Sequence, residues 1–295
     1  MSNIQLVHRT PIEKGWSGDR KYCAVDRAGK KYLLRVSAAE QYERKKLEFE
    51  QMRRVAALGI PMCEPLEFGL SEEGVYSIQS WIEGMDAKEL IPTLEGSEQY
   101  AYGRTAGLLL QKIHSLPAPE GIVRWETRFR RKAERKIRAY EACPQSYENG
   151  QAFIDYIGAN WELLHDRPNT YQHGDYHIGN MMIGEGRTLY IIDWDRNDFG
   201  DPWEEFNRIV WCAQAAPAFA AGMVDGYFDG DVPQEFWRLL ALYISSNTLS
   251  SLPWAIPFGQ EQIDIMRGQA EDVLRWYDNM RDPVPSWYRE TSALY

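Results

Sequence analysis

The sequence predicts an α+β fold of two lobes, with a small β-rich lobe over residues 1–84 and a larger, mostly helical lobe over residues 85–295. In the first eighty residues, short apolar runs alternate with turn signals, which is typical of strands. After residue 85, apolar residues recur at helical spacing and strand patterns become rare. The 295 residues are 44% hydrophobic and 13% aromatic, so the chain can bury a large core and is not wholly disordered.

The N-terminal lobe is predicted to contain five strands and one helix. The turn DRAGK joins the second strand to the third, and the turn SEEG joins the fourth to the fifth. Between these hairpins, Leu47, Met52 and Val55 recur near helical period, and Gly59 with Pro61 ends the pattern. The predicted strands are LVHRTP, KYCAVD, KKYLLRVS and the two apolar runs within EPLEFGLSEEGVYSIQSWIEG, which ends in the expected hinge between the lobes.

The C-terminal lobe begins with SEQYAYGRTAGLLLQKIHSL, where Leu108, Leu109 and Ile113 form the apolar face of a predicted helix. Loops and helices follow, with one exception. The stretch MMIGEGRTLYIIDWD has two apolar runs about a Gly-Glu-Gly turn and predicts a second small hairpin.

The charge and cysteine patterns exclude several classes of protein. The net charge of −10 argues against nucleic acid or an anionic membrane as a partner, because both repel an acidic surface. Eight Arg or Lys residues within 124–138 are interrupted by Glu126 and Glu134, and we interpret them as a solvated helix face. The four cysteines are widely spaced, as in a protein with reduced thiols. Without a signal-peptide pattern or a membrane-spanning run, we expect a cytoplasmic protein.

The stretch YQHGDYHIGNMMI, residues 171–183, contains the most informative polar residues. Asp175 can accept a proton from a hydroxyl, whereas Asn180 and Asp193 offer the oxygen ligands that Mg²⁺ prefers. Mg²⁺ usually takes one or two protein carboxylates together with phosphate oxygens. The catalytic loop of kinases also places a base Asp five residues before a metal-binding Asn, with a second metal-binding Asp after a hairpin. The pattern therefore predicts phosphoryl transfer.

The segment HGDYHIGN resembles the HGDxHxxN motif of the aminoglycoside phosphotransferase and choline kinase-like family. IIDWD is similar to the segment that carries the family's metal-binding Asp, and GDPWEEF to the stretch that follows it. The resemblance implies a protein-kinase-like fold that transfers the γ-phosphoryl group of ATP or GTP to a hydroxyl. It also implies that Asp175 is the catalytic residue and that Asn180 and Asp193 hold Mg²⁺.

The N-terminal lobe then supplies the nucleotide site that the resemblance implies. EKGWSGDRKYCAV is similar to the family's nucleotide-covering loop, which places Gly15, Ser17 and Gly18 over the phosphates. By itself this loop is better interpreted as a Gly-Ser turn, since it lacks a complete G-x-G-x-x-G, and only the motif downstream favours the nucleotide-covering loop. SIQSWIEG is similar to the hinge where backbone groups bind the base, at positions matching Ser80 and Ile82.

Arg35 departs from the family pattern, because it stands where the phosphate-anchoring lysine is expected. A guanidinium also binds phosphate oxygens, but as a planar fork rather than a point charge. Its expected partner on the following helix is Glu48, which shares a face with the apolar residues, whereas Glu50 lies beside two arginines. Both Arg35 and Glu48 are thus predicted to bind the nucleotide.

The remaining polar residues of the motifs keep alternative interpretations. His173 and His177 are predicted to orient the loop rather than to carry a proton. Asp195 is either a second metal ligand or a group that faces backbone or substrate.

The expected acceptor is the hydroxyl of a cationic small molecule, foremost an aminoglycoside-type antibiotic, docked on acidic residues of DWDRNDFGDPWEEF and of the segment after it. A metabolic kinase for choline, homoserine, a sugar or a macrolide remains an alternative. So does a nucleotide-binding regulator with little activity, which the replacement of the lysine supports.

Overall fold

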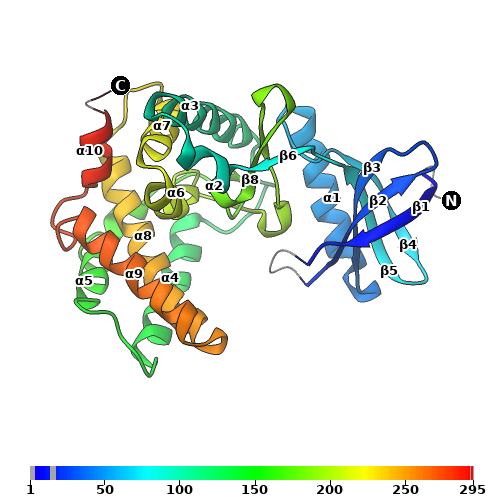
Figure 1. Ribbon diagram of the computed structural model, residues 1–295. Helices are drawn as coiled ribbons and strands as arrows, with labels where there is room; N and C mark the ends of the chain where they lie inside the picture. Colours follow the sequence, from blue (N-terminus) through cyan, green and yellow to red (C-terminus); the bar gives the residue numbers. More distant parts are fainter. Residues whose placement is uncertain (1–3, 14–17, 293, 295) are drawn as a thin grey trace. The chain divides into compact units, whose positions relative to one another are not determined.

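The computed structural model describes residues 4–13, 18–292 and 294, and their contacts divide the chain into two compact units (Figure 1). The first unit contains the chain up to Leu90 together with Gly179–Asn197. The second contains Ile91–Ile178 and the chain from Asp198 onward. The division into functional lobes at residue 84 stays a prediction.

The first unit is built around one antiparallel sheet with the strand order β1-β2-β3-β5-β4. All five strands predicted from alternating apolar residues are present, and so is the helix α1 (Tyr42–Ala57), which packs on β4 and β5. The strands are β1 (Leu6–Pro11), β2 (Arg20–Asp26), β3 (Lys31–Ser37), β4 (Pro65–Ser71) and β5 (Gly74–Ser80).

The face that α1 buries differs from the prediction at one position. Met52 and Val55 are buried as predicted, but Leu47 is 59% exposed. The polar side of the helix, with Lys45 and Glu48, lines a pocket instead. Leu47 therefore lies on the outer side of the helix.

A second, three-stranded sheet completes the first unit with a segment from far along the chain. β6 (Gly84–Asp86) pairs with β8 (Met181–Gly184), which pairs with β9 (Leu189–Ile191). The backbone N–H of Ile191 donates to the carbonyl oxygen of Pro61 at 2.9 Å. The pairing of β8 with β9 confirms the predicted hairpin, and the bond to Pro61 attaches it to the segment between α1 and β4.

The second unit is mostly helical (Figure 1). It also has one small sheet, formed by β7 (Thr170–Gln172) and β10 (Asp198–Gly200). No helix in the described part of the chain is long and apolar enough to cross a membrane. Its longer helices are α3 (Gly96–Ile113), α4 (Trp125–Glu141), α5 (Gln151–Ala159), α7 (Pro217–Phe228), α8 (Gln234–Ala255) and α9 (Gln260–Trp276); α6 (Ile209–Ala215) and α10 (Ser286–Ser292) are shorter.

Helices α3 and α7 approach each other through glycines rather than through leucines. A Cβ atom on Gly107 would lie 2.2 Å from the carbonyl oxygen of Met223, and one on Gly226 would lie 2.2 Å from that of Arg104. Only residues without a side chain permit this backbone contact. The predicted apolar face of α3 is therefore wrong at Leu108, which is 51% exposed.

Candidate active site

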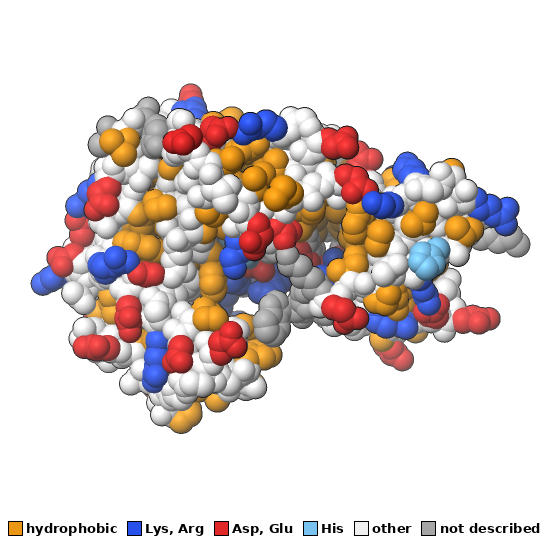
Figure 2. Space-filling model, in the orientation of Figure 1, with side chains coloured by type: hydrophobic (Ala, Val, Ile, Leu, Met, Phe, Trp, Pro, Cys, Tyr) orange, Lys and Arg blue, Asp and Glu red, His pale blue; other side chains and the backbone are white. Residues whose placement is uncertain are grey.

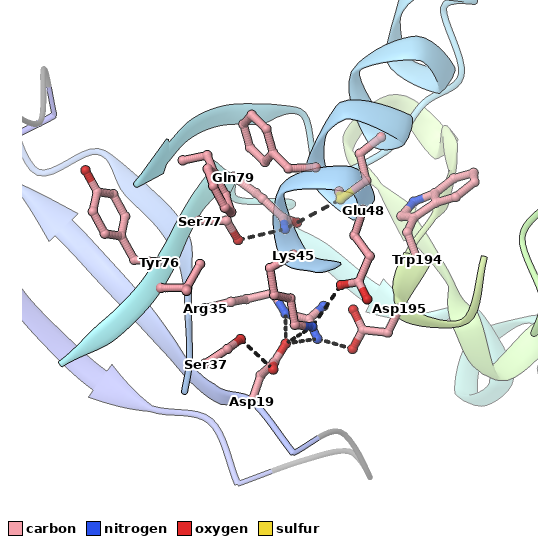
Figure 3. Close-up of a pocket in the computed structure, with 14 residues that line it drawn as sticks. Asp19, Arg35, Ser37, Lys45, Glu48, Tyr76, Ser77, Gln79, Trp194 and Asp195 are labelled. Carbon is pink, nitrogen blue, oxygen red and sulfur yellow. Dashed lines mark hydrogen bonds and ion pairs between the residues drawn. The ribbon is translucent and has the colours of Figure 1, made fainter. Parts of the chain in front are cut away.

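A pocket in the first unit has one charged wall and one apolar wall (Figure 3). Phe49, Met52, Phe68 and Val75 supply apolar surface. The charged and polar wall consists of Asp19, Arg35, Ser37, Lys45, Glu48 and Asp195, which come from the start of β2, from β3, from α1 and from the turn after β9. Such a combination suits a ligand with an apolar ring and an ionic group.

Asp19 is the hub of the charged wall. Its carboxylate accepts hydrogen bonds from Arg35 Nη2 at 3.0 Å, Lys45 Nζ at 2.9 Å and the Ser37 hydroxyl at 2.7 Å. Burial opposes ionisation of Asp19, but the hydrogen bonds from Lys45 and Ser37 and the charge of Arg35 outweigh it and lower its pKa. Asp19 thus occupies the groups that would bind an anionic ligand.

Arg35 holds three carboxylates together at the centre of β3. Besides Asp19 it contacts Asp195 directly, and its Nη1 lies 3.7 Å from Asp193 Oδ1. Burial disfavours the guanidinium charge, yet Asp195, Asp19 and Asp193 raise the pKa of Arg35 above its ordinary value. An arginine is thus accommodated at this position because acidic residues surround it.

Glu48 lines the pocket, and Glu50 is exposed, as the sequence pattern favoured. However, the ion pairs of Glu48 are with Lys45, at 2.9 Å, and Arg44, at 3.6 Å. Lys45, one turn before Glu48, therefore pairs with both Glu48 and Asp19, and Asp19 is one of the carboxylates that bind Arg35.

Of the other residues predicted to contact the nucleotide, two lie outside the described residues and three can be placed. Gly15 and Ser17 lie outside the described residues, and around Gly18 a Cβ atom would meet open space. The backbone N–H of Ser80 donates to the carbonyl oxygen of Glu64 at 2.9 Å, and the side chain of Ile82 is buried. The N–H of Ser80 is therefore already used within the protein.

Asn180 and Asp193 lie at the two ends of the β8–β9 hairpin. The N–H of Ile192, next to Asp193, donates to the carbonyl oxygen of Asn180 at 3.0 Å. Asp193 has a left-handed backbone, with φ of 65°, which is uncommon for a residue with a side chain. Its Oδ1 is buried and has no hydrogen-bond donor.

These two residues fit a Mg²⁺ ion by their chemistry. Both offer oxygen atoms, and the buried Oδ1 of Asp193 lacks the hydrogen bond that such an atom normally makes. Among the described residues, no cluster of three or more His, Cys, Asp or Glu side chains is suited to a metal. A metal held here would need further oxygens from a ligand.

Asp175 lies in the second unit, in a loop fixed mainly by its backbone. Gly174 has φ of 84°, which favours glycine, and its N–H donates to Glu205 at 2.9 Å. The N–H of Asp175 donates to Nδ1 of His173, which is fully buried. His173 thus has the position expected of a residue that orients the loop.

The Asp175 carboxylate forms an ion pair with Arg208. Its Oδ1 lies 2.7 Å from Arg208 Nε and 3.6 Å from Nε2 of His177. The side chain of Asp175 is 14% exposed and that of Arg208 is 24% exposed, so both remain within reach of a ligand. Arg208 is a site residue that no motif in the sequence indicated.

The acidic stretch that was expected to dock a cationic acceptor is largely paired within the protein. Asp201 is fully buried and accepts two hydrogen bonds from Arg167, at 2.7 and 2.9 Å, and one from the hydroxyl of Tyr243. Glu204 pairs with Lys132 at 2.9 Å. On the face drawn in Figure 2, acidic and basic side chains are interspersed over the helices rather than gathered in one acidic patch.

Comparison with known proteins places this geometry in context. The model of the phosphotransferase enzyme family matches residues 8–237. The fold is similar to that of a thermostable aminoglycoside phosphotransferase mutant crystallised with ADP and hygromycin B, with a TM-score of 0.66, 20% identity, and coverage of 92% of this chain and 94% of that one.

Two further solved structures show the same fold. A macrolide 2'-phosphotransferase from Brachybacterium faecium has a TM-score of 0.61 and 16% identity, with coverage of 90% and 93%. A choline/ethanolamine kinase family protein from Mesorhizobium loti has a TM-score of 0.66 and 15% identity, with coverage of 95% and 92%. The predicted α+β, protein-kinase-like fold is confirmed by these likenesses.

Proposed function

Because the chain belongs to the phosphotransferase enzyme family, and is thus a kinase that phosphorylates a hydroxyl, we propose that it uses ATP or GTP with Mg²⁺ and acts on a small molecule. The observation that carries this proposal is the pocket of the first unit. It combines an apolar wall with the cations Arg35 and Lys45. Beside Arg35 lies Asp193, whose buried Oδ1 lacks a hydrogen bond. A nucleoside triphosphate needs these three features.

Each site residue has a role in the proposed reaction. Arg35 and Lys45 bind phosphate oxygens, for which the nucleotide must displace Asp19 from them. Asn180 and Asp193 would hold Mg²⁺, which, when bound, neutralises charge on the phosphates. Glu48 keeps Lys45 in position through their ion pair.

Asp175 is proposed to act on the acceptor. The hydroxyl oxygen forms a bond to the γ-phosphorus while the bond from that phosphorus to the bridging oxygen breaks, and the nucleoside diphosphate leaves. The proton of the hydroxyl passes to the Asp175 carboxylate, which its hydrogen-bonded loop holds in place.

Two acceptor classes remain for this reaction. The similar structure that contains hygromycin B supports an aminoglycoside-type antibiotic, and with it a role in antibiotic resistance. The pairing of Asp201 and Glu204 within the protein favours instead a metabolic acceptor that needs no acidic surface. A cytoplasmic location, where nucleoside triphosphates are available, is part of the proposal for either class.

Asp175→Asn tests the role of the base. It is expected to bind Mg·ATP like the wild type but to turn over about 10² to 10⁴ times more slowly, because general-base catalysis contributes that much. The measurement is coupled ADP detection with a panel of aminoglycoside, choline, homoserine, sugar and macrolide acceptors. Asp229→Asn, at a side chain that is 92% exposed, is the control and should retain full activity.

Equal turnover in Asp175→Asn and the wild type would exclude Asp175 as the base. Binding of Mg·ATP without turnover of any acceptor would instead favour the nucleotide-binding regulator.

A further inference from the structure

Helix α4 carries basic residues four positions apart that face the segment 198–208. Arg128 Nη2 lies 2.6 Å from Asp198, and Lys132 Nζ lies 2.9 Å from Glu204. Residues four apart share one face of a helix, so Lys136 is the next residue on this face. This side of the basic run is therefore paired with carboxylates and partly solvated.

Lys136 breaks the pattern of alternating charges. The nearby charges along the segment include Arg208 as well as Glu204, so the cation Lys136 lies near another cation. Among the described residues, its ammonium group has no hydrogen bond or close ion pair, although the charge of Glu204 attracts it. Burial first, and then the charges of Lys132, Arg208 and Arg135, lower the pKa of Lys136 to about 7, although Glu204 opposes the shift.

Arg208, whose charge acts on Lys136, also forms the ion pair with Asp175 in the proposed catalytic loop. Its ion pair with Asp175 uses Nε, whereas the guanidinium has further N–H donors on its two Nη atoms. An anion bound there would contact Arg208 and neutralise the repulsion between Arg208 and Lys136. Its position beside Asp175 would also bring a hydroxyl of the same molecule near that carboxylate.

We propose that the acceptor carries an anionic group, a carboxylate or a phosphate, which Lys136 and Arg208 bind beside Asp175. The proposal rests on the proposed function for the identity of the bound molecule, but not for the existence of the anion site. The proposal thus specifies the charge of the acceptor. It also explains why an acidic protein keeps a poorly solvated, unpaired lysine at this place.

A matched set of acceptors tests the proposal. Glucose, glucosamine, glucuronate and glucose 6-phosphate present similar hydroxyls with neutral, cationic, carboxylate and phosphate groups. The wild type should phosphorylate at least one of the two anionic sugars with a KM about 10- to 100-fold lower than that for glucose, as a charged hydrogen bond contributes. The preferred anion distinguishes a carboxylate site from a phosphate site.

Variants of α4 separate binding from general structural effects. Lys136→Gln should raise the KM for the anionic acceptor about 10- to 100-fold with little change in kcat, and Lys136→Arg should restore much of the loss. The control Arg138→Gln removes an exposed cation from the same helix and should change neither constant. Equal KM values in Lys136→Gln and the wild type, or a preference for glucosamine, would overturn the proposal.

A binding assay decides the matter even if none of these sugars is an acceptor. With the nucleotide site saturated by Mg²⁺ and a non-hydrolysable ATP analogue, inorganic phosphate should raise the melting temperature of the wild type and of Arg138→Gln, but not of Lys136→Gln. The same increase in Lys136→Gln would refute the anion site. Failure of the analogue itself to bind would count against the proposed function and leave the phosphate result as the measure of this site.

Discussion

The lowered pKa of Lys136 predicts that its charge reduces the stability of the folded chain at neutral pH. Its pKa is lowered from 10.5 to about 7, so between these values the unfolded chain binds the proton more tightly than the folded chain. Stability therefore rises with pH over this range, and the cost of the charge is greatest below about pH 7.

Lys136→Met should accordingly be more stable than the wild type at pH 7, by on the order of 1 kcal/mol. The difference should shrink as the pH rises toward 10.5. Urea unfolding at pH 6.5, 8 and 9.5 measures it, with Arg138→Met as the exposed control. A constant difference at all three values would mean that packing, rather than charge, causes the effect.

Asp19, in contrast to Lys136, is expected to stabilise the folded chain through its charge. Its pKa is lowered, so its stabilising contribution is complete above the unfolded value of 3.8 and is lost as the pH falls through the folded value. Asp19→Asn should lose roughly 1 to 3 kcal/mol at pH 7, since it weakens bonds to two buried cations. The loss should narrow between pH 4 and pH 2.5, which thermal unfolding can follow. Ser71→Ala, which removes a hydroxyl that donates to the carbonyl oxygen of Gly74 and not to a carboxylate, should show no such pH dependence.

The candidate site residues that the sequence predicts are those whose signal is local. Asp175 and Asn180 stand five apart in one motif, and Asp193 follows one hairpin later. Lys45 and Asp19 are 26 positions apart, and no spacing rule connects a loop residue with a helix residue across a sheet. Arg208 was missed for the same reason, because only the fold brings it to Asp175.

At the scale of the element, strands were predicted well and helix faces less well. Alternating apolar residues with turns between them specify strands directly, and all five strands of the large sheet follow that pattern. The buried face of α3 was predicted from its leucines, but glycines form its contact with α7. A glycine has no hydrophobicity that a periodic pattern can detect.

The close contact of α3 and α7 makes Gly107 sensitive to substitution. Gly107→Ala would place a Cβ 2.2 Å from a backbone oxygen, so the helices must separate, at a cost of about 1 to 3 kcal/mol. Chemical denaturation measures the loss. Gly268→Ala in α9 is the matched control, because nothing lies within 4 Å of its Cβ. This control should gain about 0.5 to 1 kcal/mol from better helix propensity, and a loss of similar size in both variants would contradict the packing explanation.

For the whole molecule, ligand binding should be visible as a change in melting temperature. Mg·ATP at about 100 times its Kd should stabilise the chain by about 2.7 kcal/mol. In Asp193→Asn, the part of this stabilisation that depends on Mg²⁺ should be lost, while the smaller stabilisation by ATP alone should remain. Differential scanning fluorimetry with and without EDTA separates the two parts. An undiminished effect of Mg²⁺ in Asp193→Asn would remove that residue from the metal site.

The hairpin that pairs with β6 has a consequence for biosynthesis. The first ninety residues leave the ribosome about ninety residues before β8 and β9 do, a delay on the order of ten seconds at ordinary translation rates. During that time β6 lacks its partner strand β8, and the carbonyl oxygen of Pro61 lacks the N–H of Ile191 that it accepts from in the folded protein. The nascent chain thus exposes the unpaired backbone groups of β6 and Pro61 to chaperones and to other nascent chains, until β8 and β9 have been synthesised.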